Sequence, residues 1–276
     1  VNFGTFVTLF PQLIAGPIIK YKDLGDQIDH RTHSPEQFAS GVQIFVVGLA
    51  KKVLLANNIG KLWDTILALP ARELTTAGAW LGVAAFAFQL YFDFSGYSDM
   101  AVGLGRMLGF EFMRNFNYPY IAKSVTEFWR RWHITLGAWF KDYVFYPISL
   151  TKFVKNLSKK GKNRFGKHAG ELITSAFALF GVWFCNGLWH GTGWNYIFFG
   201  LYYFVLIFAA SAFEPLIERG TARLGIRRDG VCYQIFQRTK LLIIVFIGEM
   251  FFRAATLTAG MEMFGKIFTD FRGSQL

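Results

Sequence analysis

Two uninterrupted apolar stretches, separated by a short polar break, limit the folds open to this chain more than any other feature. Residues 169–187 carry one acidic group, Glu171, and residues 193–213 carry no charge. The stretches are 19 and 21 residues long, so each of them, as a helix, matches a hydrocarbon core about 30 Å thick. The sequence therefore predicts two membrane-spanning helices joined by a turn at residues 188–192.

The composition supports an integral membrane protein. Of 276 residues, 53% are hydrophobic and only 17% are charged, below the roughly 25% of soluble domains. The net charge of +11 could suggest a nucleic-acid partner. However, the basic residues stand in short segments beside apolar ones, which favours lipid headgroups and cytosolic anions as partners. Cys185 and Cys232 provide neither a disulfide framework nor metal-ligand spacing, so we expect no metal site.

The chain opens in an apolar run, residues 1–19, that Pro11 and Pro17 interrupt. It shows no basic leader and no small-residue cleavage site, so we do not interpret this run as a signal peptide. Our prediction is an all-α, multi-pass transmembrane protein without a clear internal repeat. We expect residues 1–276 to form a single membrane domain, as a fragment of a longer chain that has further helices before it.

A polar loop is expected at residues 20–37, followed by a helix. Ser34 is a typical helix cap, and proline in the first helical position supports this start. We expect this helix to end near Asn58. Lys51 and Lys52 interrupt its apolar pattern, which predicts a membrane interface where their side chains extend to the headgroups.

A third apolar stretch, residues 78–92, continues into residues 93–99, where polar and aromatic side chains alternate. This segment includes Asp93 and Asp99. Carboxylates at membrane depth are energetically costly, so both are expected to have partners.

Two basic segments predict the orientation. Residues 151–168 hold seven Lys or Arg and no acid, and residues 219–240 hold six against one Asp. We interpret both as cytoplasmic loops by the positive-inside rule, which places the turn at residues 188–192 on the outer side. Alternatively, this turn is re-entrant and lines a cavity. The Lys-rich loop is foremost a topology signal, and attraction of an anionic donor is the lesser interpretation.

His190 lies in the turn between the apolar stretches at residues 169–187 and 193–213. A histidine can act as a base near neutral pH, and an ionisable group at the membrane suggests catalysis. The alternative is a structural histidine that caps a helix end. Taken without the rest of the chain, these two interpretations are about equally supported.

A second histidine, His133, follows a predicted helix start. Ser124 and Glu127 form a capping box, so a helix should begin near residue 125. At helical spacing, Trp129 and His133 share a face, which Leu136 and Phe140 extend. The Trp residues of this segment are expected to be core or headgroup-belt residues, and a structural His133 is as well supported as a catalytic one. The remaining histidines, His30, His33 and His168, are expected to be solvated.

Several motifs of this chain together resemble those of the membrane-bound O-acyltransferases. They are Phe92-Asp-Phe-Ser-Gly-Tyr-Ser-Asp-Met100, Phe116-Asn-Tyr-Pro119, Phe128-Trp-Arg-Arg-Trp-His133, Lys141-Asp-Tyr143 and Leu188-Trp-His-Gly191, in this order. Within this family, the chain is most similar to the bacterial alginate O-acetyltransferase type. It is related more distantly to the teichoic acid D-alanyl transfer protein. Two positions depart from the family pattern: Lys141 stands where Arg is expected, and Gly137 where Ser is frequent.

The resemblance implies acyl transfer in a bacterial inner, cytoplasmic membrane, with amphipathic or re-entrant helices around a central tunnel. His190 matches the family's essential histidine and His133 its second, partly buried one, so both are predicted to be catalytic. His190 would act as the general base, while His133 or Asn186 would polarise the acyl oxygen. Asp93, Asp99 and Asp142 are candidates for orienting the His190 ring. The candidate substrate or tunnel residues are Trp129, Arg130, Asp93, Asp142, Asn186 and Trp189.

The resemblance further implies no permanently bound cofactor, with acetyl-CoA as the acyl donor. The expected acceptor is an exported polysaccharide, and a separate extracytoplasmic acetyltransferase is the expected partner. Two other functions remain open: D-alanyl transfer to teichoic acid from a carrier protein, and a transporter or channel in which the histidines line the pathway. A purely structural scaffold would leave the paired histidine motifs without a reason.

Overall fold

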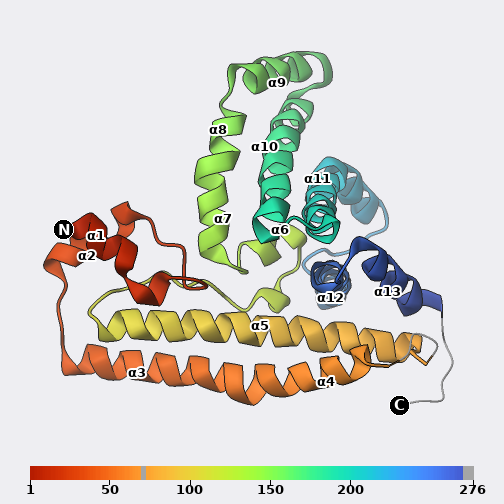
Figure 1. Cartoon of the computed structure of the whole chain (residues 1–276). Coiled ribbons are helices and arrows are strands. Elements are labelled where there is room, and N and C mark those ends of the chain that lie inside the picture. Colours follow the sequence, from red (N-terminus) through yellow and green to blue (C-terminus); the bar gives the residue numbers. More distant parts are fainter. Residues whose placement is uncertain (70–72, 270–276) are drawn as a thin grey trace. The chain divides into compact units, whose positions relative to one another are not determined.

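Helices form all of the regular secondary structure in residues 1–69 and 73–269, which are the residues that the computed structural model describes (Figure 1). Four helical segments are long and apolar enough to cross a membrane, judged by length and composition. These segments are Pro35–Leu67, Thr76–Met107, Lys167–His190 and Trp194–Arg223. The predicted all-α membrane fold is therefore confirmed, and the last two segments are the predicted helix pair.

The helices group into two compact units, which we describe one by one. Among the described residues, unit 1 comprises Val1–Pro119, Arg130–Leu136 and Lys266–Thr269. Unit 2 comprises Tyr120–Trp129 and Gly137–Gly265. This grouping does not test the prediction of a single domain, which stays a prediction.

Unit 1 contains two short helices near the start of the chain and a long antiparallel pair formed by α5 and a continuous α3–η2–α4 helix (Figure 1). Its elements are α1 (Asn2–Thr8), η1 (Phe10–Gln12), α2 (Tyr21–His30), α3 (Pro35–Ala50), η2 (Lys51–Ala56), α4 (Asn57–Leu67), α5 (Thr76–Met107) and the end of α13 (Leu257–Thr269).

The structure confirms the predicted helix start at Ser34 and corrects two predictions on either side of it. The Ser34 side chain accepts a hydrogen bond from the backbone N–H of Gln37, at 3.1 Å. The preceding segment is not only a loop, because α2 forms there. The helix does not end near Asn58 but continues to Leu67. The side-chain amide of Asn58 donates a hydrogen bond to the Leu54 carbonyl one turn earlier, at 2.9 Å. This bond satisfies the polar side chain, so the helix continues past it.

Glycine lets α3 approach α5 at backbone distance. A Cβ at Gly48 would lie 2.5 Å from the Gly96 carbonyl oxygen, and a Cβ at Gly96 would lie 2.7 Å from that of Gly48. Gly41 and Gly103 form an equivalent contact seven residues, or two helical turns, away on each helix. Small residues at helix contacts are typical of membrane proteins, where close van der Waals packing stabilises helix pairs.

Two ion pairs join the same helices beside this glycine contact. Lys51 Nζ lies 2.5 Å from Asp99 Oδ2, and Lys52 pairs with Asp93. The expectation that both aspartates have partners is confirmed. The lysines lie in η2, a π-helical turn in the interior of a continuous helix, and the prediction that they mark a membrane interface stays a prediction. A counter-charge within reach is a favourable partner for a lysine in an apolar helix.

We predict that Gly48→Ala destabilises the full-length protein. The added methyl group would have to move the backbone of α5, at a cost of about 1–3 kcal/mol. Gly60→Ala is the matched control, because the same helix places its Cβ 3.4 Å from a flexible Gln89 side chain. Thermal unfolding in detergent measures the stability of both variants. Equal stability of the two would contradict the close-contact argument.

Removal of the Lys51 charge should also destabilise the protein. Lys51→Met leaves Asp99 without its cation, and because these side chains are 27% and 31% exposed we expect about 1–2 kcal/mol. Lys51→Met combined with Asp99→Asn should recover part of this loss, since no charge is then unpaired. Lys61→Met, at an exposed position, is the control. A double variant less stable than Lys51→Met would argue against the ion pair.

Unit 2 is built around the antiparallel helices α10 and α11, which follow each other in the chain, with α12 packed on α11 (Figure 1). Its elements are most of η3 (Pro119–Ile121), α6 (Val125–Trp129), the second half of α7 (Ile134–Phe140), η4 (Lys141–Phe145), α8 (Tyr146–Ser149), α9 (Lys152–Phe165), α10 (Lys167–His190), α11 (Trp194–Arg223), α12 (Val231–Arg253) and most of α13.

Three boundaries in unit 2 differ from the sequence predictions. The basic segment at residues 151–168 is mainly a helix, α9, and much of residues 219–240 belongs to α11 and α12. Lys and Arg are good helix formers, so positive charge does not by itself indicate a loop. The turn after the first apolar stretch is shorter than predicted, because α10 continues through His190.

The predicted helical face joining Trp129 to His133 is wrong. The capping box does form, because the Glu127 N–H bonds to Ser124 Oγ at 3.1 Å and the Glu127 carboxylate accepts from the Lys123 N–H at 2.9 Å. However, α6 ends at Trp129, and α7 begins only at Ile134. His133 has φ of +44°, in the left-handed region, so the chain turns sharply between the two helices.

Candidate active site

His190 is the last residue of α10 and is surrounded by aromatic rings. The ring centroids of Trp189, Phe252 and Phe199 lie 4.7, 4.9 and 6.0 Å from its own, all nearly perpendicular to it. The side chain is half-buried. Within the described part of unit 2, no residue forms a hydrogen bond with the imidazole, so its nitrogen atoms are available to a substrate.

Close packing of α10 on α11 fixes the position of His190. A Cβ at Gly187 would lie 2.7 Å from the Tyr196 carbonyl oxygen, so only glycine lets the α11 backbone come this near. The Gly191 N–H bonds back to the Gly187 carbonyl at 3.3 Å and ends the helix directly after the histidine. The two helices therefore hold His190 at a defined point beside the start of α11.

Asn186 lies one helical turn before His190 and projects from the same face of α10. Its side chain is buried, and its Oδ1 atom has no hydrogen-bond partner among the described residues. A buried amide oxygen without a donor is costly, at about 1–3 kcal/mol. This oxygen is therefore a place where a substrate N–H or O–H could bind.

Trp129, at the end of α6, connects with His190 through a cluster of rings. Its centroid lies 4.9 Å from that of Trp183, 4.8 Å from Tyr203 and 6.1 Å from Phe199, which also contacts His190. The Trp129 Nε1 atom is buried without a hydrogen-bond partner among the described residues. Trp129 is thus a half-buried member of this ring cluster, and its Nε1 donor is free for a ligand.

Glu249 was missed by the sequence analysis. It lies about one turn before the end of α12, is 3% exposed, and its two carboxyl oxygens are 3.2 and 3.3 Å from the Tyr120 hydroxyl. Tyr120 in turn packs on Phe128 of α6. A signal was present, because Glu249 is the one acid within the apolar residues 241–252. This contact positions α6, and with it Trp129, against α12.

His133 belongs to unit 1, where it is 6% exposed and packs edge-to-face on Phe94, with the centroids 4.8 Å apart. Its Nδ1 atom lies 3.1 Å from Asn115 Oδ1. The same oxygen accepts hydrogen bonds from the N–H and the hydroxyl of Thr135, at 3.2 and 2.9 Å. Asn115, which the sequence analysis did not single out, thereby organises the turn that contains His133.

These contacts indicate the tautomer of His133. The Thr135 N–H can only donate, so the Asn115 atom that it meets is the carbonyl oxygen, which can only accept. The hydrogen between Asn115 and His133 therefore belongs to Nδ1. In the neutral ring, this assignment leaves Nε2 as the hydrogen-bond acceptor.

The other candidate residues are distributed between the two units. Asp93 pairs with Lys52 in unit 1, where Arg130 is exposed. In unit 2, Asp142 is exposed on η4 and Trp189 is 54% exposed beside His190. The structure thus brings together His190, Trp189, Asn186 and Trp129. The roles proposed for Asp93, Asp99 and Asp142 in orienting His190 stay predictions. In the chain as described, no three His, Cys, Asp or Glu side chains gather to hold a metal ion.

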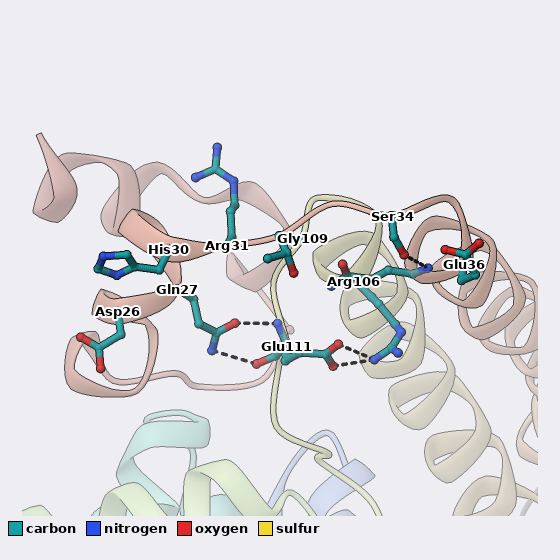
Figure 2. Close-up of a pocket in the computed structure, with 11 residues that line it drawn as sticks. Asp26, Gln27, His30, Arg31, Ser34, Glu36, Arg106, Gly109 and Glu111 are labelled. Carbon is teal, nitrogen blue, oxygen red and sulfur yellow. Dashed lines mark hydrogen bonds and ion pairs between the residues drawn. The ribbon is translucent and has the colours of Figure 1, made fainter.

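Unit 1 also contains a polar cavity of about 570 Å³ between α2, α3 and the end of α5 (Figure 2). Arg106 pairs with Glu111, whose backbone N–H donates to the Gln27 amide oxygen at 2.7 Å. Arg106, Glu111 and Gln27 thus engage one another at the wall of this cavity. His30 lies at the cavity and is exposed, in agreement with its prediction as a solvated residue.

The chain matches the model of one protein family over most of its length. The model of the membrane-bound O-acyltransferase family matches residues 1–254. The chain belongs to this family.

Three relatives that the chain is similar to carry the names of different acyl-transfer reactions. The chain is 41% identical, over 98% of its length, to "Probable alginate O-acetylase AlgI" of Pseudomonas aeruginosa, of which it covers 46%. It is 37% identical, over 73% of its length, to the "Peptidoglycan O-acetyltransferase" of Helicobacter pylori, covering 35% of that protein. It is also 32% identical, over 76% of its length, to the "Teichoic acid D-alanyltransferase" of Bacillus subtilis, covering 51%.

The chain spans about half the length of the alginate O-acetylases that it matches. For a member of the membrane-bound O-acyltransferase family, a membrane location agrees with the four apolar helices. The family resemblance predicted from the sequence is therefore confirmed.

We predict that Asn115→Leu destabilises unit 1 of the full-length protein by about 2 kcal/mol or more, because it leaves three buried groups without their acceptor. Asn117→Leu makes the same change at an exposed position two residues away and should have little effect. Thermal unfolding in detergent compares the two variants. Equal stability would show that Asn115 does not organise the His133 turn.

Proposed function

We propose that the protein is a membrane O-acyltransferase that moves an acetyl group from a cytoplasmic donor, such as acetyl-CoA, to an exported or cell-surface polysaccharide. The observation that carries this proposal is the half-buried His190 ring, which ends an apolar helix without a hydrogen-bond partner in its unit. Two of the relatives described above are named for O-acetyl chemistry, which supports acetyl as the group transferred.

The chemistry requires one base and one stabilising donor. His190 would take the proton of the attacking hydroxyl as its oxygen bonds to the thioester carbonyl carbon. Collapse of the intermediate breaks the carbon–sulfur bond, and the imidazolium returns the proton to the leaving thiolate. A donor in the same unit, such as Trp129 Nε1 or the Asn186 amide, would stabilise the oxyanion, an effect worth about 3 kcal/mol for one donor.

The proposal includes further expectations from the family resemblance. We expect a multi-pass protein of the bacterial cytoplasmic membrane, whose catalytic residues lie along a tunnel. No permanently bound cofactor is expected. A separate extracytoplasmic acetyltransferase would complete the transfer. D-alanyl transfer is the second candidate, because a relative that is 32% identical carries that name.

The test measures transfer of radiolabelled acetyl from acetyl-CoA to polysaccharide in membranes that contain the full-length protein and its candidate partner. His190→Ala should reduce labelling by at least about 100-fold, the lower range of a general base's contribution. His168→Ala, at the exposed start of the same helix, should keep it.

Full labelling by His190→Ala at equal expression would remove the base role. Labelling from a D-alanyl carrier protein but not from acetyl-CoA would move the assignment to D-alanyl transfer. Absence of both, with ion or solute flux that depends on His190, would instead support a transporter.

A further inference from the structure

An open groove lies between α11 and α12 in unit 2. The two helices are joined where the Tyr202 hydroxyl donates to the Ile244 carbonyl, at 2.8 Å, and the Tyr203 hydroxyl to the Val245 carbonyl, at 3.4 Å. From this junction toward residues 224–230, the helices enclose a cavity of about 1110 Å³. This volume exceeds the roughly 300–1,000 Å³ typical of small-molecule sites.

The wall of the groove is apolar and open to the surroundings. On α11, the small side chains of Ala209 and Ala210 leave space at its deeper end, and Phe213 and Ile217 continue the same helical face. Phe236 of α12 stands opposite. Phe213, Ile217 and Phe236 are all exposed, so a large apolar surface is left uncovered among the described residues. Such a surface favours hydrocarbon chains as its occupant.

The rim of the groove is positively charged. Four cations line it, Lys123, Arg227, Arg228 and Lys240, against one acid, Glu214. Arg228 pairs with Glu214 at 2.7 Å, and this hydrogen bond raises the pKa of the guanidinium, which stays charged. Arg227 pairs with Asp229 outside the lining. No ion pair engages Lys123 or Lys240 within the described chain, so both are available to an anion.

The combination identifies the ligand class. A soluble anion would need the cations but not the apolar wall, and a neutral lipid would need the wall but not the cations. We propose that this groove binds one anionic phospholipid of the surrounding bilayer. Its phosphate lies between Lys123 and Lys240, and its acyl chains lie along Phe213, Ile217 and Phe236. Three of the four rim cations, Arg227, Arg228 and Lys240, belong to the basic segment predicted to face the cytoplasm. Anionic lipids there attract basic residues, and basic pockets between helices bind lipid headgroups.

This site is distinct from the general attraction of a basic protein to a membrane. The α9 helix also carries several cations, among them the exposed Lys159 and Lys160, but it does not line the groove. The site also does not depend on the proposed acyl transfer, because none of its lining residues contacts His190. The α9 lysines therefore provide a matched control for charge alone.

The experiment measures binding of phosphatidylglycerol and phosphatidylcholine with identical acyl chains to the full-length protein in detergent, by native mass spectrometry. The wild type should retain one phosphatidylglycerol and little phosphatidylcholine. Lys123→Ala with Lys240→Ala should weaken phosphatidylglycerol binding about tenfold or more, because each lysine contributes to attraction of an anionic headgroup. Lys159→Ala with Lys160→Ala should leave it unchanged.

A second variant tests the apolar wall without changing charge. Ala210→Trp adds a large side chain at an exposed position in the groove and should also reduce phosphatidylglycerol binding, with unchanged thermal stability in lipid-free detergent. Equal binding of the two lipids, equal losses in the two lysine pairs, or undiminished binding by Ala210→Trp would overturn the proposal. Displacement of the lipid by coenzyme A would also overturn it, because the groove would then be a site for the acyl donor. A wild type that binds no lipid in the groove would likewise overturn it, because another segment or partner would then cover the apolar wall.

Discussion

Charges carried by apolar helices need counter-charges within the protein, and two lysine–aspartate pairs meet this constraint between the long helices of unit 1. Lys51 and Lys52 lie in the interior of one long helix, and their aspartate partners lie six residues apart on α5. The pairs form only because glycines bring the two helices to backbone distance beside them. Polar pairing and close packing therefore depend on each other, and loss of either would weaken both.

The same two principles organise the surroundings of the candidate catalytic residues. In unit 2, glycine contacts between α10 and α11 set the position of His190, while the buried Glu249 fixes the segment before α6 through Tyr120. In unit 1, Asn115 provides one acceptor for three groups around His133. These supporting residues are not expected to touch a substrate. Their effect is to hold rings and donors in place, which is the larger part of building a catalytic site.

In the part of the chain that the structure describes, two buried polar atoms without partners belong to the residues around His190, and others, such as Trp63 Nε1 and Ser95 Oγ, lie in unit 1. Trp129 Nε1 and Asn186 Oδ1 are buried without partners among the described residues, and the His190 ring is without a hydrogen bond in its unit. Native proteins rarely leave such groups unpaired unless a ligand or ordered water completes them. The groove between α11 and α12 differs in kind, because its cations stand at the rim and its wall is apolar. The two places therefore favour different ligands, a reacting acyl group at the first and a phospholipid at the second.

The sequence by itself determined the helical membrane class, the family, the helix starts at Ser34 and Ser124, and the two histidine motifs, because hydrophobic length, capping residues and motif order are local properties. Tertiary structure alone decided which lysine meets which aspartate, where the chain breaks between Trp129 and His133, and that Glu249 lies buried against Tyr120. Each of these outcomes depends on residues far apart in the chain. The left-handed turn at His133 shows the reason: its backbone conformation is unfavourable locally and persists because Asn115 and Thr135 satisfy the groups around it.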